Sequence, residues 1–204
     1  MAELSVARSE LVLGGQKSGK SRRAEDLARC WLWQSAAHRA VMVATAQPWD
    51  DEMRERIARH QQDRAERVPG MATVEEPLAL ASAIAQHSDA NTLLVVDCLT
   101  LWLTNRLMPA VEAPAGPHNA NLKPNRPQAP VESNGIALLS GAITNASGPI
   151  VLVSNEIGLG VIPMGREVRA FVDALGRLNQ NVAAACARVT LMAAGLPLAM
   201  KDAA

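Results

Sequence analysis

Short apolar runs recur along the chain, and each has the length of a β-strand. They occupy residues 11–13, 40–44, 93–96, 149–153 and 189–192. The run at 93–96, Leu-Leu-Val-Val, shows no polar alternation, which is typical of a strand buried on both faces of a sheet. We predict a strand at each of these runs.

Between the runs, apolar residues fall at helical spacing. Those of segment 24–31 stand at i, i+3, i+4 and i+7, which places them on one face of a helix over residues 22–33. A second helix begins after Asp50 or Asp51, either of which can cap it. The same pattern predicts helices over 78–87, 136–143 and 166–187. Residues 73–77 lead into the first of these, and residues 99–107 receive no assignment.

This alternation predicts one α/β domain spanning residues 1–204, with a mostly parallel sheet flanked by helices on both faces. In such sheets, ligand sites collect at the carboxyl ends of the strands. Gly14, Thr45, Asp97 and Asn155 all follow predicted strands, so we expect them to rim one site. Residues 109–134 hold many prolines among Ala, Asn and Gly, which favours a mobile surface insertion over a separate domain.

Charge and apolar content exclude several functional classes. Lys plus Arg and Asp plus Glu number 20 each, so nothing points to nucleic acid or to an anionic membrane surface. No stretch approaches the roughly 18 apolar residues of a membrane span, and the first residues lack a basic and then apolar leader. The 3 cysteines are widely spaced, which favours reduced thiols in a cytoplasmic protein.

The first apolar run ends in a segment of the form G-x-x-x-x-G-K-S, a complete Walker A motif between a predicted strand and a predicted helix. Glycines let backbone N–H groups surround phosphate oxygens, and the helix N-terminus adds positive potential. In this chemistry the lysine contacts the β- and γ-phosphates, and the serine hydroxyl binds Mg²⁺. The predicted nucleotide-phosphate site comprises Gly14, Gly15, Gln16, Lys17, Ser18, Gly19, Lys20 and Ser21.

Asp97 ends the apolar run at 93–96, as the aspartate of a Walker B motif does. A carboxylate in this position holds Mg²⁺ directly or through water, although an Asp at a strand end often only caps a helix. Beside a P-loop, the pattern favours Ser21 and Asp97 as the metal-binding residues.

His60 is the candidate catalytic residue. Arg56 and Arg64 lie four residues to either side of it, so the three side chains project together from one helix. The arginines suit a triphosphate, and an imidazole between them suits nucleophilic attack. His60 also shares a face with Met53 and Ile57, so from spacing alone a packing role stays open.

The sequence leaves the role of two further segments undecided. Asn155 and Glu156 precede a glycine-containing loop, and they are either a substrate contact or a polar turn. Gly176 stands inside the helix predicted at 166–187, where glycine costs about 1 kcal/mol relative to alanine. It indicates either close packing or a ligand contact.

Taken together, the chain resembles the bifunctional adenosylcobinamide kinase/adenosylcobinamide-phosphate guanylyltransferases of cobalamin biosynthesis. The matching stretches run in the family's order from one end of the chain to the other. They are GGQKSGKS at 14–21, DDEMRERIARHQQDR at 50–64, TVEEPLAL at 73–80, VVDCLTLWLTN at 95–105, SNEIGLGVIP at 154–163 and GRLNQ at 176–180.

The resemblance implies two reactions. ATP or GTP first phosphorylates the aminopropanol hydroxyl of adenosylcobinamide. GTP then guanylylates a histidine, and the phosphorylated cobinamide takes up the GMP group to give adenosylcobinamide-GDP. The family's nucleophilic histidine matches His60. The resemblance also implies a RecA-like P-loop fold and a homotrimer. Nucleotide contacts outside the P-loop match Thr45, Ala46, Gln47, Arg64, Glu75 and Asp97.

The chain departs from the family at three places. Lys17 stands where Arg is common, which keeps the charge but not a bidentate phosphate contact. Met71 lies near the position where the family has an aromatic residue, so we expect the packing beneath the nucleotide to differ from that of the family. The Pro-rich insertion stands where the family often has a more ordered helical segment. We expect this difference to affect how the substrate is covered and not the chemistry.

Two other classes of function fit the P-loop alone. One is a small-molecule kinase without a covalent intermediate, in which His60 only packs. The other is a nucleotide-gated regulatory module, in which hydrolysis switches the Pro-rich insertion. Covalent labelling by α-labelled GTP separates the bifunctional enzyme from both.

Overall fold

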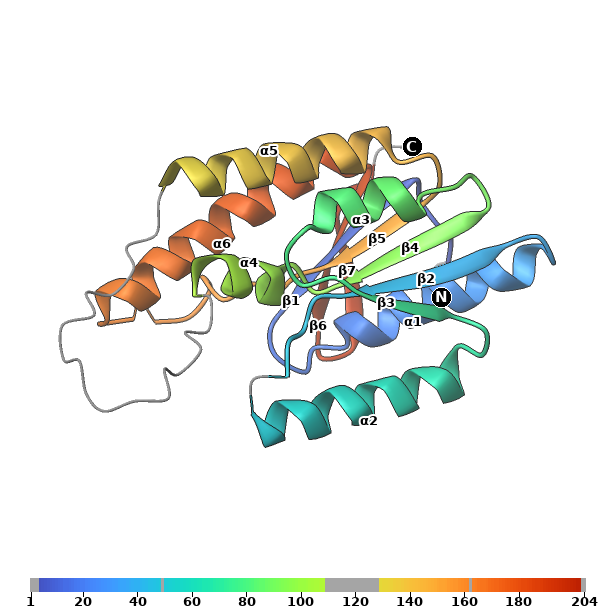
Figure 1. Ribbon diagram of the computed structural model, residues 1–204, viewed down its shortest axis with the longest axis horizontal. Helices are drawn as coiled ribbons and strands as arrows, with labels where there is room; N and C mark the ends of the chain where they lie inside the picture. Colours follow the sequence, from blue (N-terminus) through green and yellow to red (C-terminus); the bar gives the residue numbers. More distant parts are fainter. Residues whose placement is uncertain (1–3, 49, 109–128, 162, 203–204) are drawn as a thin grey trace, which may run out of the picture.

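The computed structural model describes residues 4–48, 50–108, 129–161 and 163–202. They include a seven-stranded sheet in the order β3-β2-β4-β5-β1-β6-β7, which is parallel except for its last strand (Figure 1). The strands are β1 (Ser9–Gly14), β2 (Arg39–Ala44), β3 (Ala72–Glu75), β4 (Thr92–Asp97), β5 (Ile150–Val153), β6 (Arg188–Ala193) and β7 (Leu196–Asp202).

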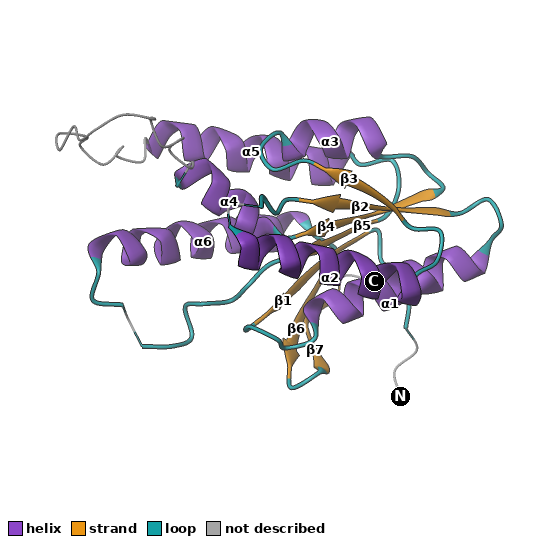
Figure 2. Ribbon diagram, turned by 60° about the horizontal axis from the view of Figure 1, so that its bottom comes forward, coloured by secondary structure: helices purple, strands orange, loops and turns teal. Residues whose placement is uncertain are grey.

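Helices cover both faces of the sheet, which confirms the predicted α/β class. They are α1 (Lys20–Gln34), α2 (Asp51–Arg67), α3 (Leu80–His87), α4 (Leu99–Leu107), α5 (Ala129–Asn145) and α6 (Arg166–Ala185). Helices α3, α5 and α6 lie on one side, and α1 and α2 lie on the other (Figures 1 and 2). In the described part of the chain, no helix combines the length and the apolar character needed to cross a lipid bilayer.

The two apolar cores follow from the alternation of side chains along each strand. Leu11 and Leu13 of β1 belong to the core beneath α3, α5 and α6, whereas Val12 between them packs against α1. Because both faces are covered, the parallel strands are apolar throughout, as β4 is from Leu93 to Val96.

The parallel register brings the functional strand ends together. β5 lies between β1 and β4, with Val153 paired to Val12 on one side and to Asp97 on the other. The P-loop, which follows β1, and Asp97, which ends β4, therefore lie at the same edge of the sheet.

The structure corrects the sequence prediction at both edges of the sheet. Residues 73–75, predicted only as an approach to a helix, pair with β2 as the edge strand β3. Its side chains are largely exposed, so it carries no apolar signal. At the other edge, Ala194 and Gly195 turn the chain with positive φ into β7, a strand that the prediction missed.

Two helices also differ from the prediction. Residues 99–107, which had no assignment, form α4. The last six residues of the predicted insertion, 129–134, form the start of α5, which begins well before the predicted residue 136. Pro130 lies in the first turn of that helix, where its missing N–H costs nothing. The rest of the predicted mobile insertion, 109–128, lies outside the described residues.

Candidate active site

The P-loop connects β1 to α1 with a backbone that two glycines make possible. A Cβ on Gly14 would lie 2.5 Å from the Met192 carbonyl oxygen and 2.5 Å from Ser18 Oγ, so only glycine fits. Gly19, at φ 101°, adopts a left-handed conformation directly before α1. Lys17 has φ 55° without being glycine, a backbone strain typical of ligand-binding turns.

The first residues of α1 carry the polar groups of the motif. Lys20 is buried, and its Nζ donates to the Gly15 carbonyl oxygen at 2.7 Å, so the ammonium lies over the loop. Burial lowers the pKa of Lys20, and the nearby Cys98 and Asp97 oppose this shift. Ser21 Oγ donates to Asp97 Oδ2 at 2.9 Å. The structure therefore joins the serine of the predicted Walker A motif to the aspartate of the predicted Walker B motif.

This pair fits a magnesium ion by its chemistry. A hydroxyl and a carboxylate are hard oxygen donors, and Mg²⁺ characteristically takes only one or two carboxylates from protein, together with phosphate oxygens and water. Among the described residues, no cluster of three or more His, Cys, Asp or Glu side chains is arranged to hold a metal. A magnesium ion held by Ser21 and Asp97 would take its remaining oxygen ligands from phosphate and water.

A cavity of about 1110 Å³ opens beside the P-loop, between α1, α2 and the carboxyl ends of the strands. Its described lining includes eight Lys or Arg side chains but only five Asp or Glu. This excess of positive charge suits a polyphosphate. The predicted site residues that line it are Gln16, Lys17, Ser18, Gly19, Lys20, Ser21, Ala46, His60, Arg64, Glu75 and Asp97.

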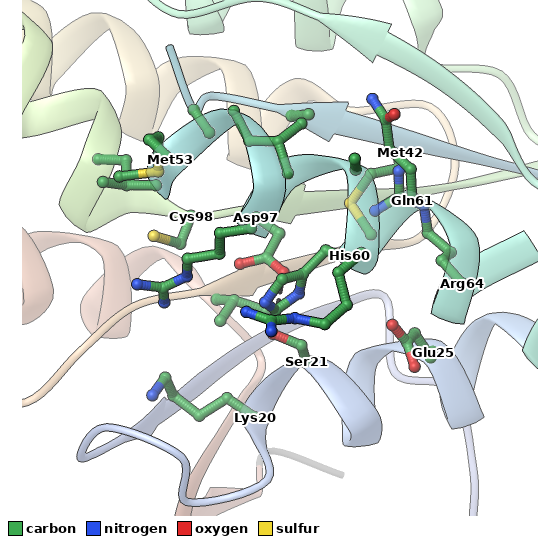
Figure 3. A pocket seen from close by; sticks show the side chains of 18 of the residues that line it. Lys20, Ser21, Glu25, Met42, Met53, His60, Gln61, Arg64, Asp97 and Cys98 are labelled. Carbon is green, nitrogen blue, oxygen red and sulfur yellow. Dashed lines mark hydrogen bonds between the residues drawn. The ribbon is translucent and has the colours of Figure 1, made fainter. Parts of the chain in front are cut away.

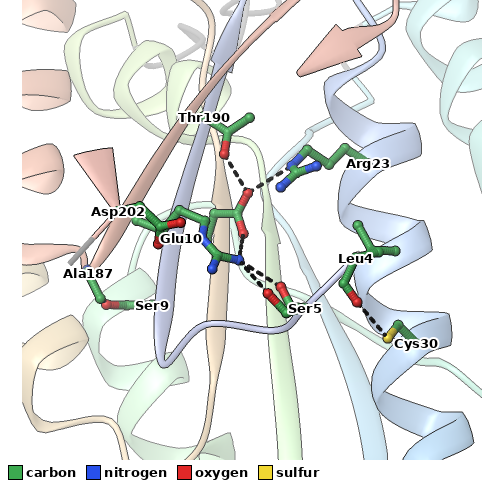
Figure 4. Close-up of polar contacts among 10 residues, drawn as sticks. Leu4, Ser5, Ser9, Glu10, Arg23, Cys30, Ala187, Thr190 and Asp202 are labelled. Atoms are coloured by element: carbon green, nitrogen blue, oxygen red, sulfur yellow. Dashed lines mark hydrogen bonds and ion pairs between the residues drawn. The ribbon is translucent and has the colours of Figure 1, made fainter. Parts of the chain in front are cut away.

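His60 lies on α2, which begins at Asp51 after the Asp50 side chain caps it by accepting a hydrogen bond from the Met53 N–H at 2.7 Å. The side chain of His60 is exposed and lines the cavity that Ser21 and Asp97 also line. In Figure 3 its ring extends from α2 toward these two residues. The ring is therefore neither sealed in the interior nor turned away from the P-loop, as a purely packing role would require.

Of the predicted site residues, Gly14, Gly15, Thr45 and Gln47 do not contribute to the described lining, whereas Ala46 does. Thr45 is fully buried beneath the site. Its Oγ1 donates to the Cys98 carbonyl oxygen at 2.7 Å and accepts from the Cys98 N–H at 2.9 Å. Asn105 of α4 donates to the Thr45 carbonyl oxygen at 2.8 Å. Thr45 thus supports the segment that follows Asp97 rather than facing the cavity.

Arg64 and Glu75 also line the cavity. Arg64 is the buried residue of α2, and its Nη2 donates to Thr73 Oγ1 of β3 at 3.2 Å. Glu75 is exposed at the end of the same strand. The edge strand that the sequence prediction missed therefore places a carboxylate in the site and anchors α2.

The segment after β5 is held by α6. Asn179 accepts a hydrogen bond from Ser154 Oγ at 2.7 Å and donates to the Asn155 carbonyl oxygen at 3.0 Å. Asn155 lines the cavity and so belongs to the site. Glu156 is not part of the described lining, and its Oε1 accepts a hydrogen bond from the Gly158 N–H at 3.0 Å, as in a polar turn. A Cβ on Gly176 would meet no atom within 4 Å, so close packing does not explain that glycine.

Cys98 lines the cavity as a buried thiol. Burial, reinforced by the adjacent Asp97 carboxylate, raises its pKa to about 12. At neutral pH Cys98 therefore remains protonated and is a poor nucleophile. The thiol is therefore not a competitor of His60 as the nucleophile of the cavity.

Sequence reasoning missed Glu25 of α1 and Arg67 of α2, which both line the cavity and form an ion pair at 3.0 Å. Hydrogen bonding to Glu25 raises the pKa of Arg67. The spacing of seven residues, two helical turns, places Arg67 on the face of His60 and was a usable signal. Nothing in the sequence pattern marks Glu25 as its partner, because the pair joins two different helices.

The comparisons with known proteins agree along most of the chain. The sequence model of the family described as cobinamide kinase / cobinamide phosphate guanyltransferase matches residues 10–200. The bifunctional adenosylcobalamin biosynthesis protein CobP of Pseudomonas aeruginosa is 43% identical over 192 residues, which cover 94% of this chain and 96% of that protein. The protein of the same description from Escherichia coli, CobU, is 33% identical over 191 residues, which cover 94% and 98%.

Solved structures extend the likeness of fold. A protein of Pyrococcus horikoshii OT3 superposes with a TM-score of 0.51 at 10% identity, covering 97% of this chain and 88% of that one. At this identity the match concerns the fold alone.

Proposed function

This chain belongs to the cobinamide kinase / cobinamide phosphate guanyltransferase family, and from that premise we propose that it catalyses both reactions at the cavity beside the P-loop. The observation that carries the proposal is the shared lining: the P-loop lysine and serine, Asp97 and His60 all face the same cavity. A phosphate-gripping loop and a nucleophile within one cavity are what a nucleotidyl transfer through the protein requires.

In the kinase step, the aminopropanol hydroxyl of adenosylcobinamide attacks the γ-phosphorus of ATP or GTP. The bond to the bridging oxygen breaks, and the nucleoside diphosphate leaves. Lys20 and the backbone N–H groups of the P-loop bind the phosphate oxygens and stabilise the charge that develops on them. Ser21 and Asp97 would hold Mg²⁺, which when bound neutralises part of the negative charge of the phosphates.

In the transferase step, an imidazole nitrogen of His60 attacks the α-phosphorus of GTP. The bond to the α–β bridging oxygen breaks, pyrophosphate leaves, and a phosphoramidate joins GMP to the protein. A phosphate oxygen of adenosylcobinamide phosphate then attacks the same phosphorus. The P–N bond breaks, which releases adenosylcobinamide-GDP and restores His60. The covalent intermediate divides one difficult transfer into two displacements.

Nucleotide contacts outside the P-loop belong to the same proposal. Arg64 and Glu75 both line the cavity, where Arg64 suits phosphate and Glu75 suits the donor groups of a base or ribose. The proposal gives Ala46 a backbone contact, whereas Thr45 acts from beneath the site.

We further propose that the protein works as a homotrimer in the cytoplasm, as the family resemblance implies. Leu196, Leu198 and Met200 of the edge strand β7 are each at least 60% exposed, a surface that a second copy would cover. Sedimentation equilibrium tests the assembly, and three times the chain mass of 21.7 kDa is the expected result.

The test of the catalytic proposal follows the corrinoid through both steps. Wild-type protein is incubated with adenosylcobinamide, ATP, GTP and Mg²⁺, and the corrinoid products are separated by chromatography. We expect adenosylcobinamide-GDP from the wild type, and accumulation of adenosylcobinamide phosphate with His60→Ala. Equal yields of adenosylcobinamide-GDP from both proteins would exclude the covalent route and favour a kinase in which His60 only packs.

A further inference from the structure

We propose that the ion pair between Glu25 and Arg67 positions His60: it fixes α2 to the helix that begins at the P-loop, so that the imidazole faces the bound nucleotide. This inference rests on the proposed role of His60. It assigns to Glu25 and Arg67 no contact with the reacting atoms.

Helix α2 has little apolar contact to fix its orientation. Of its 17 residues, only Arg64 is buried, and most of the others are exposed. Its C-terminal end is anchored where Val68, just after the helix, enters the apolar core. The direction in which the helix faces therefore depends on a few polar contacts near this end.

His60, Arg64 and Arg67 form one stripe along α2. Their spacing of four and then three residues places them on the same face, and all three line the cavity. Arg64 contacts Thr73 of the edge strand, and Arg67 contacts Glu25 of α1. A helix held at these two points cannot rotate without breaking one of them, and rotation is the motion that would turn His60 away.

Glu25 is suited to hold its partner firmly. Its side chain is 5% exposed, whereas that of Arg67 is 39% exposed. A buried carboxylate that loses its cation is strongly disfavoured, so the pair is retained where a surface pair would dissociate readily. Glu25 also lies in the second turn of the helix that starts with Lys20 and Ser21. The residue that anchors α2 is thus rigidly connected to the residues that grip phosphate, as Figure 3 illustrates for Glu25, Lys20 and Ser21.

Two features of α2 itself help to hold the Arg67 side chain in place. Arg67 stands in the last turn, where the helix dipole favours a cation, and its second guanidinium nitrogen lies 3.4 Å from Asp63. The guanidinium group of Arg67 therefore contacts the carboxylate of Asp63 on its own helix and that of Glu25 on α1. This geometry fixes both the position of the guanidinium and the rotation of α2.

The two proposed reactions depend differently on this arrangement. Attack by His60 on the α-phosphorus needs the ring in line with the leaving group, and a misplacement of about 1 Å can cost roughly 100-fold in rate. The kinase step transfers the γ-phosphate to a corrinoid hydroxyl without His60. Loosening the ion pair should therefore slow guanylylation far more than phosphorylation.

The experiment compares wild type, Glu25→Gln, Arg67→Gln and the double variant in two assays. The first is the single-turnover rate of protein labelling by α-labelled GTP at saturation. The second is the steady-state kinase rate with ATP and adenosylcobinamide. We expect each variant to label about 10- to 100-fold more slowly while its kinase rate stays within about threefold, and the double variant to be no slower than either single one. The GTP concentration for half-maximal labelling should not change.

Glu66→Gln is the matched control, because Glu66 is the residue before Arg67 on α2, is exposed, and is not among the described residues that line the cavity. It should label at the wild-type rate. Arg67→Lys provides a second test if Glu25→Gln folds poorly: it keeps the charge but not the fork, and its labelling rate should fall between those of wild type and Arg67→Gln.

The outcomes separate this inference from the proposal on which it rests. Absence of label from the wild type contradicts the proposed function itself. A labelled wild type together with Glu25→Gln and Arg67→Gln variants that label equally fast overturns the positioning role alone. An equal loss of both activities with a lowered melting temperature also overturns it, because the pair would then serve only stability.

Discussion

Thr45 provides a sharp test of how the site is built, because the resemblance predicts a nucleotide contact and the structure buries the side chain beneath the cavity. Its hydroxyl bonds both the N–H and the carbonyl oxygen of Cys98, the residue after Asp97. Thr45→Val keeps the shape of the side chain and removes both hydrogen bonds. Thr45→Ser keeps both bonds and removes one methyl group.

The expected loss of stability follows from the hydrogen bonds that the N–H and the carbonyl oxygen of Cys98 keep in each variant. The Cys98 carbonyl oxygen keeps a hydrogen bond from the Trp102 N–H at 3.1 Å, so it loses only its second bond, worth about 0.5–1 kcal/mol. The buried Cys98 N–H is left without its Thr45 acceptor, at a cost of about 1–3 kcal/mol. Thr45→Val should therefore lower the free energy of unfolding by about 1.5–4 kcal/mol, and Thr45→Ser by about 1 kcal/mol.

Urea unfolding without nucleotide, followed by circular dichroism, measures both variants. In a chain of this length, the loss in Thr45→Val corresponds to a fall in melting temperature of about 3–16 °C. A Thr45→Val protein as stable as Thr45→Ser would refute this reasoning. If that protein also bound GTP more weakly, the hydroxyl would be a ligand contact instead of a support.

Four further outcomes are expected. Asp97→Asn, or removal of divalent cations with a chelator, should lower both the kinase and the labelling rates by at least about 100-fold, measured by product formation with restored Mg²⁺ as the control. Lys20→Met should abolish both activities while leaving the melting temperature unchanged or raised, since the substitution removes a buried charge. Because burial raises the pKa of Cys98 and of Cys186 to about 12, a thiol reagent at pH 8 should leave both unmodified in the native protein and modify all 3 cysteines after denaturation. Asn179→Leu should cost about 2–4 kcal/mol in urea unfolding, because the groups of the loop after β5 that it holds lose their partner.

The order of elements and the phosphate site were predictable because strong local signals mark them. The apolar runs of β1 and β4 are buried on both faces, and the P-loop needs glycines at fixed positions for steric reasons. The two edge strands were not predictable in this way. β3 is short and exposed, and β7 exposes its apolar side chains instead of burying them, so neither shows the pattern of a buried strand.

The part of the site that depends on contacts between distant segments also escaped the sequence. Thr45 follows a strand as a ligand residue would, but a hydrogen bond to Cys98, 53 positions away, turns its side chain from the cavity. Glu25 looks like a surface acid of an amphipathic helix until Arg67 is placed against it. Both placements follow from tertiary packing and not from the periodicity of either segment.

The most direct measurement of the central claim is the chemical identity of the guanylylated residue. Protein incubated with GTP and Mg²⁺ is digested at alkaline pH, where a phosphoramidate survives, and the peptides are analysed by mass spectrometry. We predict one GMP group on His60, its loss on acid treatment, and its absence from the His60→Ala variant. The control is His87→Ala, because His87 lies on α3 and is not among the described residues that line the cavity; this variant should be labelled like the wild type. GMP attached to any other residue, or label that persists in His60→Ala, would contradict the account.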